Sequence, residues 1–117
     1  MYSDDIISPL LQHGANPNLT DVSGNTPLHW AAQVGEIDGV QTLLKHHANI
    51  NVQDKQGRTA LMLCVEYANK GDMIRELLKQ GANTHLKDLR GVTALGYARS
   101  EDYPEMVRLW KAARATK

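Results

Sequence analysis

The sequence predicts an all-α fold, a solenoid in which pairs of antiparallel helices stack side by side. Two observations lead to this prediction. A motif recurs with a period near 33 residues, and apolar residues in the second half of each copy are spaced three and four apart. Each copy is amphipathic and too short to bury its own apolar face, so neighbouring copies must stack. The 117 residues are enough for one domain, and we predict a single repeat domain over 1–117.

The recurring glycine column divides the chain into repeats. Gly24 and Gly57 are 33 residues apart, whereas Gly57 and Gly91 are 34 apart, so one copy carries an extra residue. Comparison of the columns on either side places that residue between Val65 and Ile74. We expect a partial repeat over 1–20, full repeats over 21–53 and 54–87, and a C-terminal capping repeat over 88–117.

Each full copy is expected to begin with a hairpin-like turn and a short first helix. The turn glycine, Gly24 in the first full copy, suits a backbone with positive φ. Thr26 is an N-cap residue, and Pro27 fits the first helical position because its missing N–H costs nothing there. We expect Gly35 and Gly71 to end the first helices of their copies.

A second helix is expected to follow each first helix. His47 stands in the column of Gly14 and Gly81, where a helix commonly ends in a left-handed residue, so we expect a positive φ at His47. The inward face of the second helix follows the i, i+3, i+4 spacing, with Val40, Leu43 and Leu44 in one copy and Ile74, Leu77 and Leu78 in the next.

The stretch GNTPLHWAA, which begins at Gly24, resembles the ankyrin repeat in both its motif and its period. The second and third copies keep the threonine and the leucine but lack the proline and the histidine. The resemblance covers almost the whole chain and implies a solenoid of helix pairs joined by β-hairpin-like turns. It also implies that His29 hydrogen-bonds within its turn, and that the hairpins and first helices bind protein partners.

The composition of the chain argues against several classes of function. The 13 Lys and Arg residues balance the 13 Asp and Glu residues, which argues against binding to nucleic acid or to an anionic membrane. The longest apolar run, 60–65, is far shorter than the ~20 residues that span a bilayer, and no secretory signal pattern is present. One cysteine cannot form an internal disulfide and is typical of a reducing compartment. We therefore expect an intracellular protein, cytoplasmic or nuclear.

The polar side chains form no catalytic or metal-binding motif. His46 and His47 are adjacent and point about 100° apart on a helix, so they cannot chelate one ion together. Cys64 lies in an apolar run, which favours a buried thiol. The aspartate that opens each hairpin, such as Asp54, commonly bonds its own turn. We expect no catalytic residue, no bound metal and no cofactor, and hence no enzyme.

The candidate partner site consists of positions that vary from copy to copy around the turn glycines and at the ends of the first helices. Basic residues outnumber acidic ones there, so we expect an acidic or mixed peptide surface as the partner. Arg58, Tyr67 and Arg90 are expected to reach one ligand surface, and the framework is expected to gain little from them. The full set is Val22, Ser23, Asn25, Gln33, Val34, Lys55, Gln56, Arg58, Glu66, Tyr67, Leu89, Arg90, Val92 and Arg99.

A second function remains open on the same face, namely a reader of a small charged ligand or of a modified-lysine peptide. It depends either on the cluster of arginines or on Trp30 and Tyr97, which share a column with Leu63 between them. Aromatic pairs can form a cage for a methylated lysine. Packing between helices is the competing explanation of that column.

The partial repeat at the N-terminus has apolar residues without a first helix to cover them. Only five residues precede Ile6, although Ile7, Leu10 and Leu11 follow with the spacing of a second helix. Solenoids usually end in a polar cap. We expect the chain to be a piece of a longer array or to self-associate at this end.

Overall fold

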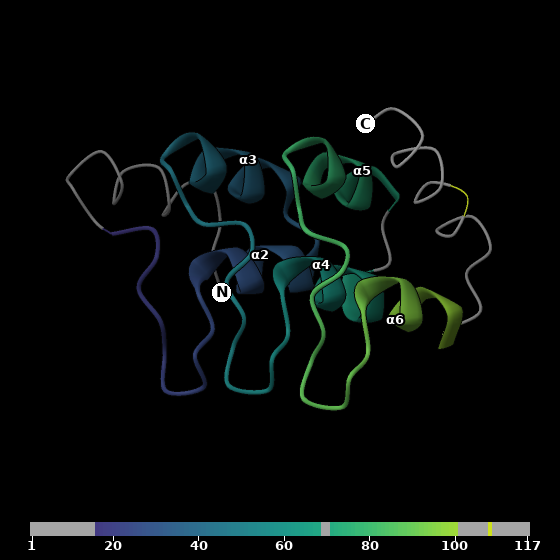
Figure 1. Cartoon of the computed structure of the whole chain (residues 1–117). Coiled ribbons are helices and arrows are strands. Elements are labelled where there is room, and N and C mark those ends of the chain that lie inside the picture. The colour runs from purple at the N-terminus through teal and green to yellow at the C-terminus, as the bar shows by residue number, and fades with distance from the viewer. Residues whose placement is uncertain (1–15, 69–70, 101–107, 109–117) are drawn as a thin grey trace.

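The computed structural model in Figure 1 is a layered stack of short helices with hairpin-like loops along one edge. It describes residues 16–68, 71–100 and 108. One layer contains α2 (Pro27–Val34), α4 (Ala60–Leu63) and α6 (Ala94–Ser100). A second layer contains α3 (Ile37–Lys45) and α5 (Gly71–Lys79). The described residues include no strand, and the predicted all-α solenoid is confirmed.

The first helices begin as the sequence predicts. In each copy the threonine hydroxyl accepts a hydrogen bond from the third helical amide, which satisfies one of the free donors of the first turn. Pro27 is the first residue of α2, and Gly35 ends that helix with a φ of 81°. The three hydroxyl contacts measure 3.4 Å for Thr26, 3.3 Å for Thr59 and 3.1 Å for Thr93.

The extra residue of the second full repeat lies in its first helix. That helix begins as α4 and continues through a π-helix at Cys64–Ala68. A π turn closes its hydrogen bonds between residues five apart and so holds one residue more than an α turn. This position agrees with the insertion expected between Val65 and Ile74.

The prediction that Gly71 ends a first helix was wrong, because Gly71 is the first residue of α5. The inserted residue shifts every later column by one position. Gly71 therefore aligns with Ile37, where α3 begins, and not with Gly35, where α2 ends.

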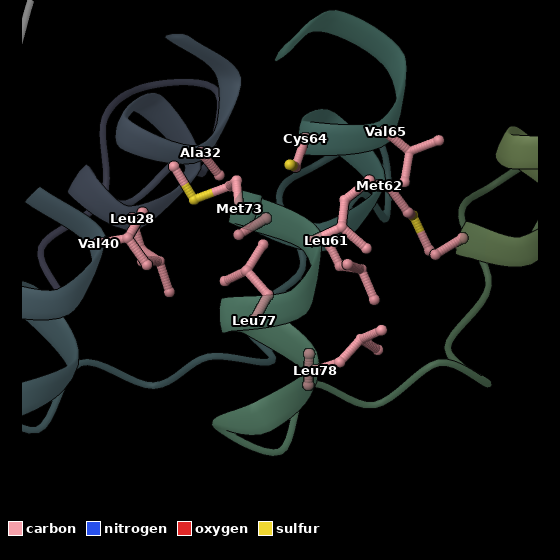
Figure 2. Packing of buried hydrophobic residues seen from close by; sticks show 14 of the residues in the cluster. Leu28, Ala32, Val40, Leu61, Met62, Cys64, Val65, Met73, Leu77 and Leu78 are labelled. Carbon is pink, nitrogen blue, oxygen red and sulfur yellow. The ribbon is translucent and has the colours of Figure 1, made fainter. Parts of the chain in front are cut away.

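The core lies between the two helix layers, where the second-helix stripes meet the inward faces of the first helices. Figure 2 shows Leu28, Val40, Leu61, Met73 and Leu77 in one cluster drawn from α2, α3, α4 and α5, and each of them is almost fully buried. Burial of an aliphatic side chain of this size contributes roughly 1.5–3 kcal/mol. The predicted inward residues thus join neighbouring repeats into one core.

Neighbouring hairpins are joined by backbone hydrogen bonds. The amide of Lys55 donates to the carbonyl of Ser23 at 3.0 Å, and the amide of Leu89 donates to the carbonyl of Gln56 at 2.9 Å. The hairpins therefore stack in register along the edge visible in Figure 1.

Each hairpin is closed by its opening aspartate, as the sequence predicts. Oδ1 of Asp54 accepts from the amides of Gln56 and Arg58, both at 2.9 Å. Asp21 and Asp88 accept from the equivalent amides two and four residues later. One carboxylate oxygen per repeat is thus committed to holding its own turn.

His47 has the expected positive φ, 71°, just after α3. A left-handed backbone costs a residue with a Cβ roughly 1–2 kcal/mol. We expect His47→Gly to raise the free energy of unfolding by about 1 kcal/mol, because the extra chain entropy of glycine offsets part of the relief. Urea denaturation followed by circular dichroism measures this change.

The matched control for His47→Gly is Gly81→Ala in the same column of the next repeat. Gly81 has a φ of 92°, and no described atom lies within 4 Å of an added Cβ. The alanine variant is therefore expected to lose stability through backbone strain alone. An unchanged or lower urea midpoint for His47→Gly would contradict the argument.

Several expectations fall on residues outside the described part of the chain. They include the uncovered apolar residues Ile6, Ile7, Leu10 and Leu11 and most of the capping repeat. The repeat boundaries and the self-association at the N-terminal end therefore stay predictions.

Candidate functional site

An open cavity of about 360 Å³ lies between the second and third hairpins and the adjoining first helices. Two neighbouring repeats contribute to its wall. Most of its lining belongs to the predicted partner set, and Asp88 and Tyr97 are the additions. The lining residues are Gln56, Arg58, Glu66, Tyr67, Asp88, Leu89, Arg90 and Tyr97.

The other predicted partner residues lie outside this lining. Val22, Ser23, Asn25, Gln33 and Val34 belong to the preceding repeat, and Val22 and Val34 are exposed there. Oδ1 of Asn25 is buried and has no hydrogen-bond partner among the described residues. Two further positions, Lys55 and Val92, belong to the hairpins but not to the lining, and the side chain of Arg99 on α6 is outside the described part.

Asp88, Arg90 and Tyr97 form a hydrogen-bonded cluster on one wall of the cavity. Tyr97 Oη donates to Asp88 Oδ2 at 2.5 Å, and Arg90 Nη2 donates to the same oxygen at 3.1 Å. Arg90 Nη2 also donates to Tyr97 Oη at 3.1 Å, and the guanidinium lies 5.5 Å from the centroid of the Tyr97 ring. The Arg90 head group is thus held by a carboxylate, a hydroxyl and an aromatic ring.

The environment fixes the protonation states of this cluster. Burial alone would raise the pKa of Asp88, but hydrogen bonds from Tyr97, Val92 and Arg90 outweigh it and lower the pKa to about 2. Burial and the bond to Asp88 raise the pKa of Tyr97 to about 12. Asp88 is therefore a carboxylate and Tyr97 a neutral phenol at physiological pH, as a fixed hydrogen-bond cluster requires.

Arg58 is paired in a similar way on the preceding hairpin. Its Nε donates to Oδ2 of Asp54 at 3.1 Å, and the side chain of Arg58 is 20 % exposed. A buried carboxylate left without its partner is strongly destabilising. The expectation that the framework gains little from Arg58 was therefore wrong, because Arg58 neutralises the buried aspartate of its hairpin. Arg90 pairs with buried Asp88 in the same way, but its own side chain is 70 % exposed.

His29 hydrogen-bonds within its turn, as expected, and also contacts the next repeat. The amide of Thr26 donates to Nδ1 of His29 at 3.0 Å, so Nε2 carries the proton and donates to the carbonyl of Arg58 at 2.9 Å. Burial lowers the pKa of His29, which keeps the ring neutral. Met62 and Gly96 stand in this column in the later repeats, and neither side chain can donate an equivalent bond.

Trp30 and Tyr97 are not brought together. Trp30 Nε1 donates to Asp21 at 3.3 Å in the first full repeat, whereas Tyr97 is bonded to Asp88 two repeats further on. α4 lies between α2 and α6 (Figure 1), and Leu63 of the same column is fully buried. Each aromatic side chain is therefore tied to its own hairpin.

Among the described residues, the remaining metal-ligating and nucleophilic side chains do not form a metal or catalytic site. Within residues 16–68, 71–100 and 108, no group of three or more His, Cys, Asp or Glu could hold a metal ion. Cys64 is fully buried in the core. In the same part of the chain, none of the helices has the length and apolar character that crossing a bilayer requires.

A second cavity, of about 440 Å³, lies where α3 and α5 begin. None of its lining residues belongs to the predicted partner set. They are Gly35, Ile37, Gly71, Asp72 and Met73.

A family model described as ankyrin repeats (3 copies) matches residues 1–54 and 46–110 of the chain. The chain therefore belongs to the ankyrin-repeat family, whose repeats generally serve as protein–protein interaction modules. No curated protein matches the chain.

Proposed function

We propose that the chain is a non-catalytic protein-interaction module whose partner binds across the hairpins and the ends of the first helices. The cavity of about 360 Å³ is the centre of this surface. The observation that carries the proposal is the exposure of Tyr67 and Leu89, 53 % and 78 %, on its wall. The single cysteine favours a partner in the cytoplasm or the nucleus.

The distribution of exposed apolar side chains favours this face. Among the described residues, every exposed large apolar side chain lies on a loop, on α2 or on the π-helix, and none lies on α3 or α5. Apolar surface left exposed in this way commonly marks an interaction site. The residues concerned are Leu19, Val22, Trp30, Val34, Tyr67 and Leu89.

The π-helix gives the second full repeat a feature that the first lacks. Glu66 and Tyr67 lie in the π-helix and line the cavity, whereas Gln33 and Val34, at the end of α2, line neither of the two cavities described above. Single π turns within helices occur frequently at functional sites. The inserted residue therefore supports a binding role for this helix end.

The test measures how substitutions on the hairpin face and on the α3–α5 face affect binding of one partner. That partner is recovered from a lysate and identified by mass spectrometry. Tyr67→Ala and Leu89→Ser should each weaken binding of the partner about fivefold or more, since truncation of an anchor at the centre of an interface costs ~1 kcal/mol or more. Both side chains are exposed, so the melting temperature should change little. Arg58→Ala is a poor probe because it also leaves Asp54 unpaired.

The matched controls are Lys45→Ala and Lys79→Ala, which remove exposed side chains at the ends of α3 and α5. In isothermal titration calorimetry, both control variants should bind the partner with the same dissociation constant as the unmodified protein. Equal losses from the two faces would overturn the proposed site.

A further inference from the structure

The charges around the cavity are not equally available to a partner. Arg58 is paired with Asp54, and Arg90 is paired with Asp88. Glu66 lines the same cavity, and its carboxylate makes no hydrogen bond or ion pair with the side chain or backbone of any other described residue. Once the internal pairs are set aside, the charge left among the described residues of the cavity wall is a single negative one.

The neighbours of Glu66 are suited to the stem of a long side chain. The Arg90 guanidinium already lies over the Tyr97 ring, so Tyr67 is the exposed ring of the cavity. Leu89 adds an exposed apolar side chain from the next hairpin. A carboxylate beside an aromatic ring and an apolar side chain favours lysine or arginine, whose stem packs on apolar surface while its head meets the charge.

We propose that the partner inserts one basic side chain, lysine or arginine, into this cavity, with its charged head at Glu66 and its stem against Tyr67 and Leu89. The inference rests on the proposed function and names the partner chemistry. An acidic side chain would meet the like charge of Glu66, and the nearby arginines are already neutralised. The acidic partner expected from counting charges therefore does not fit this cavity, because a count does not register the internal pairs.

The cavity is large enough to admit an inserted side chain. At about 360 Å³ it lies at the lower end of the range for small-molecule pockets, roughly 300–1,000 Å³. The rest of a partner segment would lie along the exposed hairpins.

The experiment selects short random peptides displayed on phage against the immobilised protein. The selected peptides should share a lysine or arginine at one position, and replacement of that residue by norleucine should weaken binding about tenfold or more. Fluorescence anisotropy of the synthetic peptides measures the affinity. Glu66→Gln should cause a similar loss, and the norleucine peptide should lose little more on that variant, because the two changes remove the same contact. The loss should shrink at high salt.

The matched control is Glu76→Gln, which removes a carboxylate from α5 on the far layer and should leave the affinity unchanged. Acidic peptides, an absence of enriched peptides, or equal affinity for Glu66→Gln would each overturn the inference. If Tyr67→Ala abolishes binding while Glu66→Gln does not, the proposed binding face is supported and the proposed insertion of a basic side chain is refuted. If neither variant affects binding, the proposed face is wrong as well.

Discussion

Gly57→Ala is expected to lower the free energy of unfolding by about 3 kcal/mol, whereas Gly91→Ala should lower it by about 1 kcal/mol. Both glycines have a φ of 80°, so both variants carry the strain of a left-handed residue, roughly 1–2 kcal/mol. A Cβ at Gly57 would also lie 2.9 Å from Asp88 Cα and 2.9 Å from Leu89 N. These are backbone atoms of the next hairpin, so the hairpins must separate, and overpacking of this kind costs roughly 1–3 kcal/mol.

Gly91 is the matched control, because no described atom lies within 4 Å of a Cβ added there. Gly24→Ala should fall between the two, since its Cβ would lie 3.0 Å from Lys55 N. Urea denaturation of the three variants under identical conditions gives the order. Equal losses at Gly57 and Gly91 would show that close approach of the hairpins does not constrain the stack.

Asp88→Asn is expected to lower the free energy of unfolding by about 2 kcal/mol at neutral pH. Its two carboxylate oxygens accept from two backbone amides, from Tyr97 and from the guanidinium of Arg90. Hydrogen bonds to a charged group contribute roughly 1.5–3 kcal/mol. The asparagine amide has one N–H₂ group in place of an oxygen. That group would face either the donors of Tyr97 and Arg90 or the two backbone amides, and the hydrogen bonds on that side would be lost.

The pH dependence of the same variant follows from the lowered pKa of Asp88. The ordinary pKa is 3.8, and the folded protein lowers it to about 2. The stabilisation is therefore complete above pH 3.8 and is lost as the pH falls toward 2. The stability gap between the unmodified protein and Asp88→Asn should be constant above this range and narrow within it.

Asp21→Asn is the control for Asp88→Asn. Asp21 occupies the same column but is exposed, and among the described residues its second oxygen accepts a single bond, from Trp30 at 3.3 Å. We expect a smaller loss of stability for Asp21→Asn. A gap for Asp88→Asn that stays constant through the acidic range would contradict the role of the charge.

Most of the fold could be predicted because its signals are local. The Thr column and Pro27 define the helix starts, and the spacing of Val40 and Leu43 defines a buried stripe. Gly71 was misplaced because an insertion changes the register downstream, and a glycine can begin a second helix as well as end a first one. The period of the repeat located the extra residue but gave no indication of its π-helical geometry.

The candidate site could be predicted in part for the same reason. Residues in the same column of adjacent repeats lie side by side, which is why the hairpins that carry Arg58 and Arg90 form one wall. The internal pairing of these arginines was missed, because it depends on side-chain geometry. Their spacings from Asp54 and Asp88, four and two residues, were the available signal. The column of Tyr97 indicates an aromatic ring but not the hydrogen bonds of its hydroxyl with Asp88 and Arg90.

The most direct test of the binding surface is an NMR titration of the labelled protein with a peptide selected by display. The largest amide shifts are expected on 56–58, 66–67 and 89–90, the segments that line the cavity, while the amides of α3 and α5 should change little. Shifts concentrated on α3 and α5, with the hairpin and π-helix amides unchanged, would contradict this expectation.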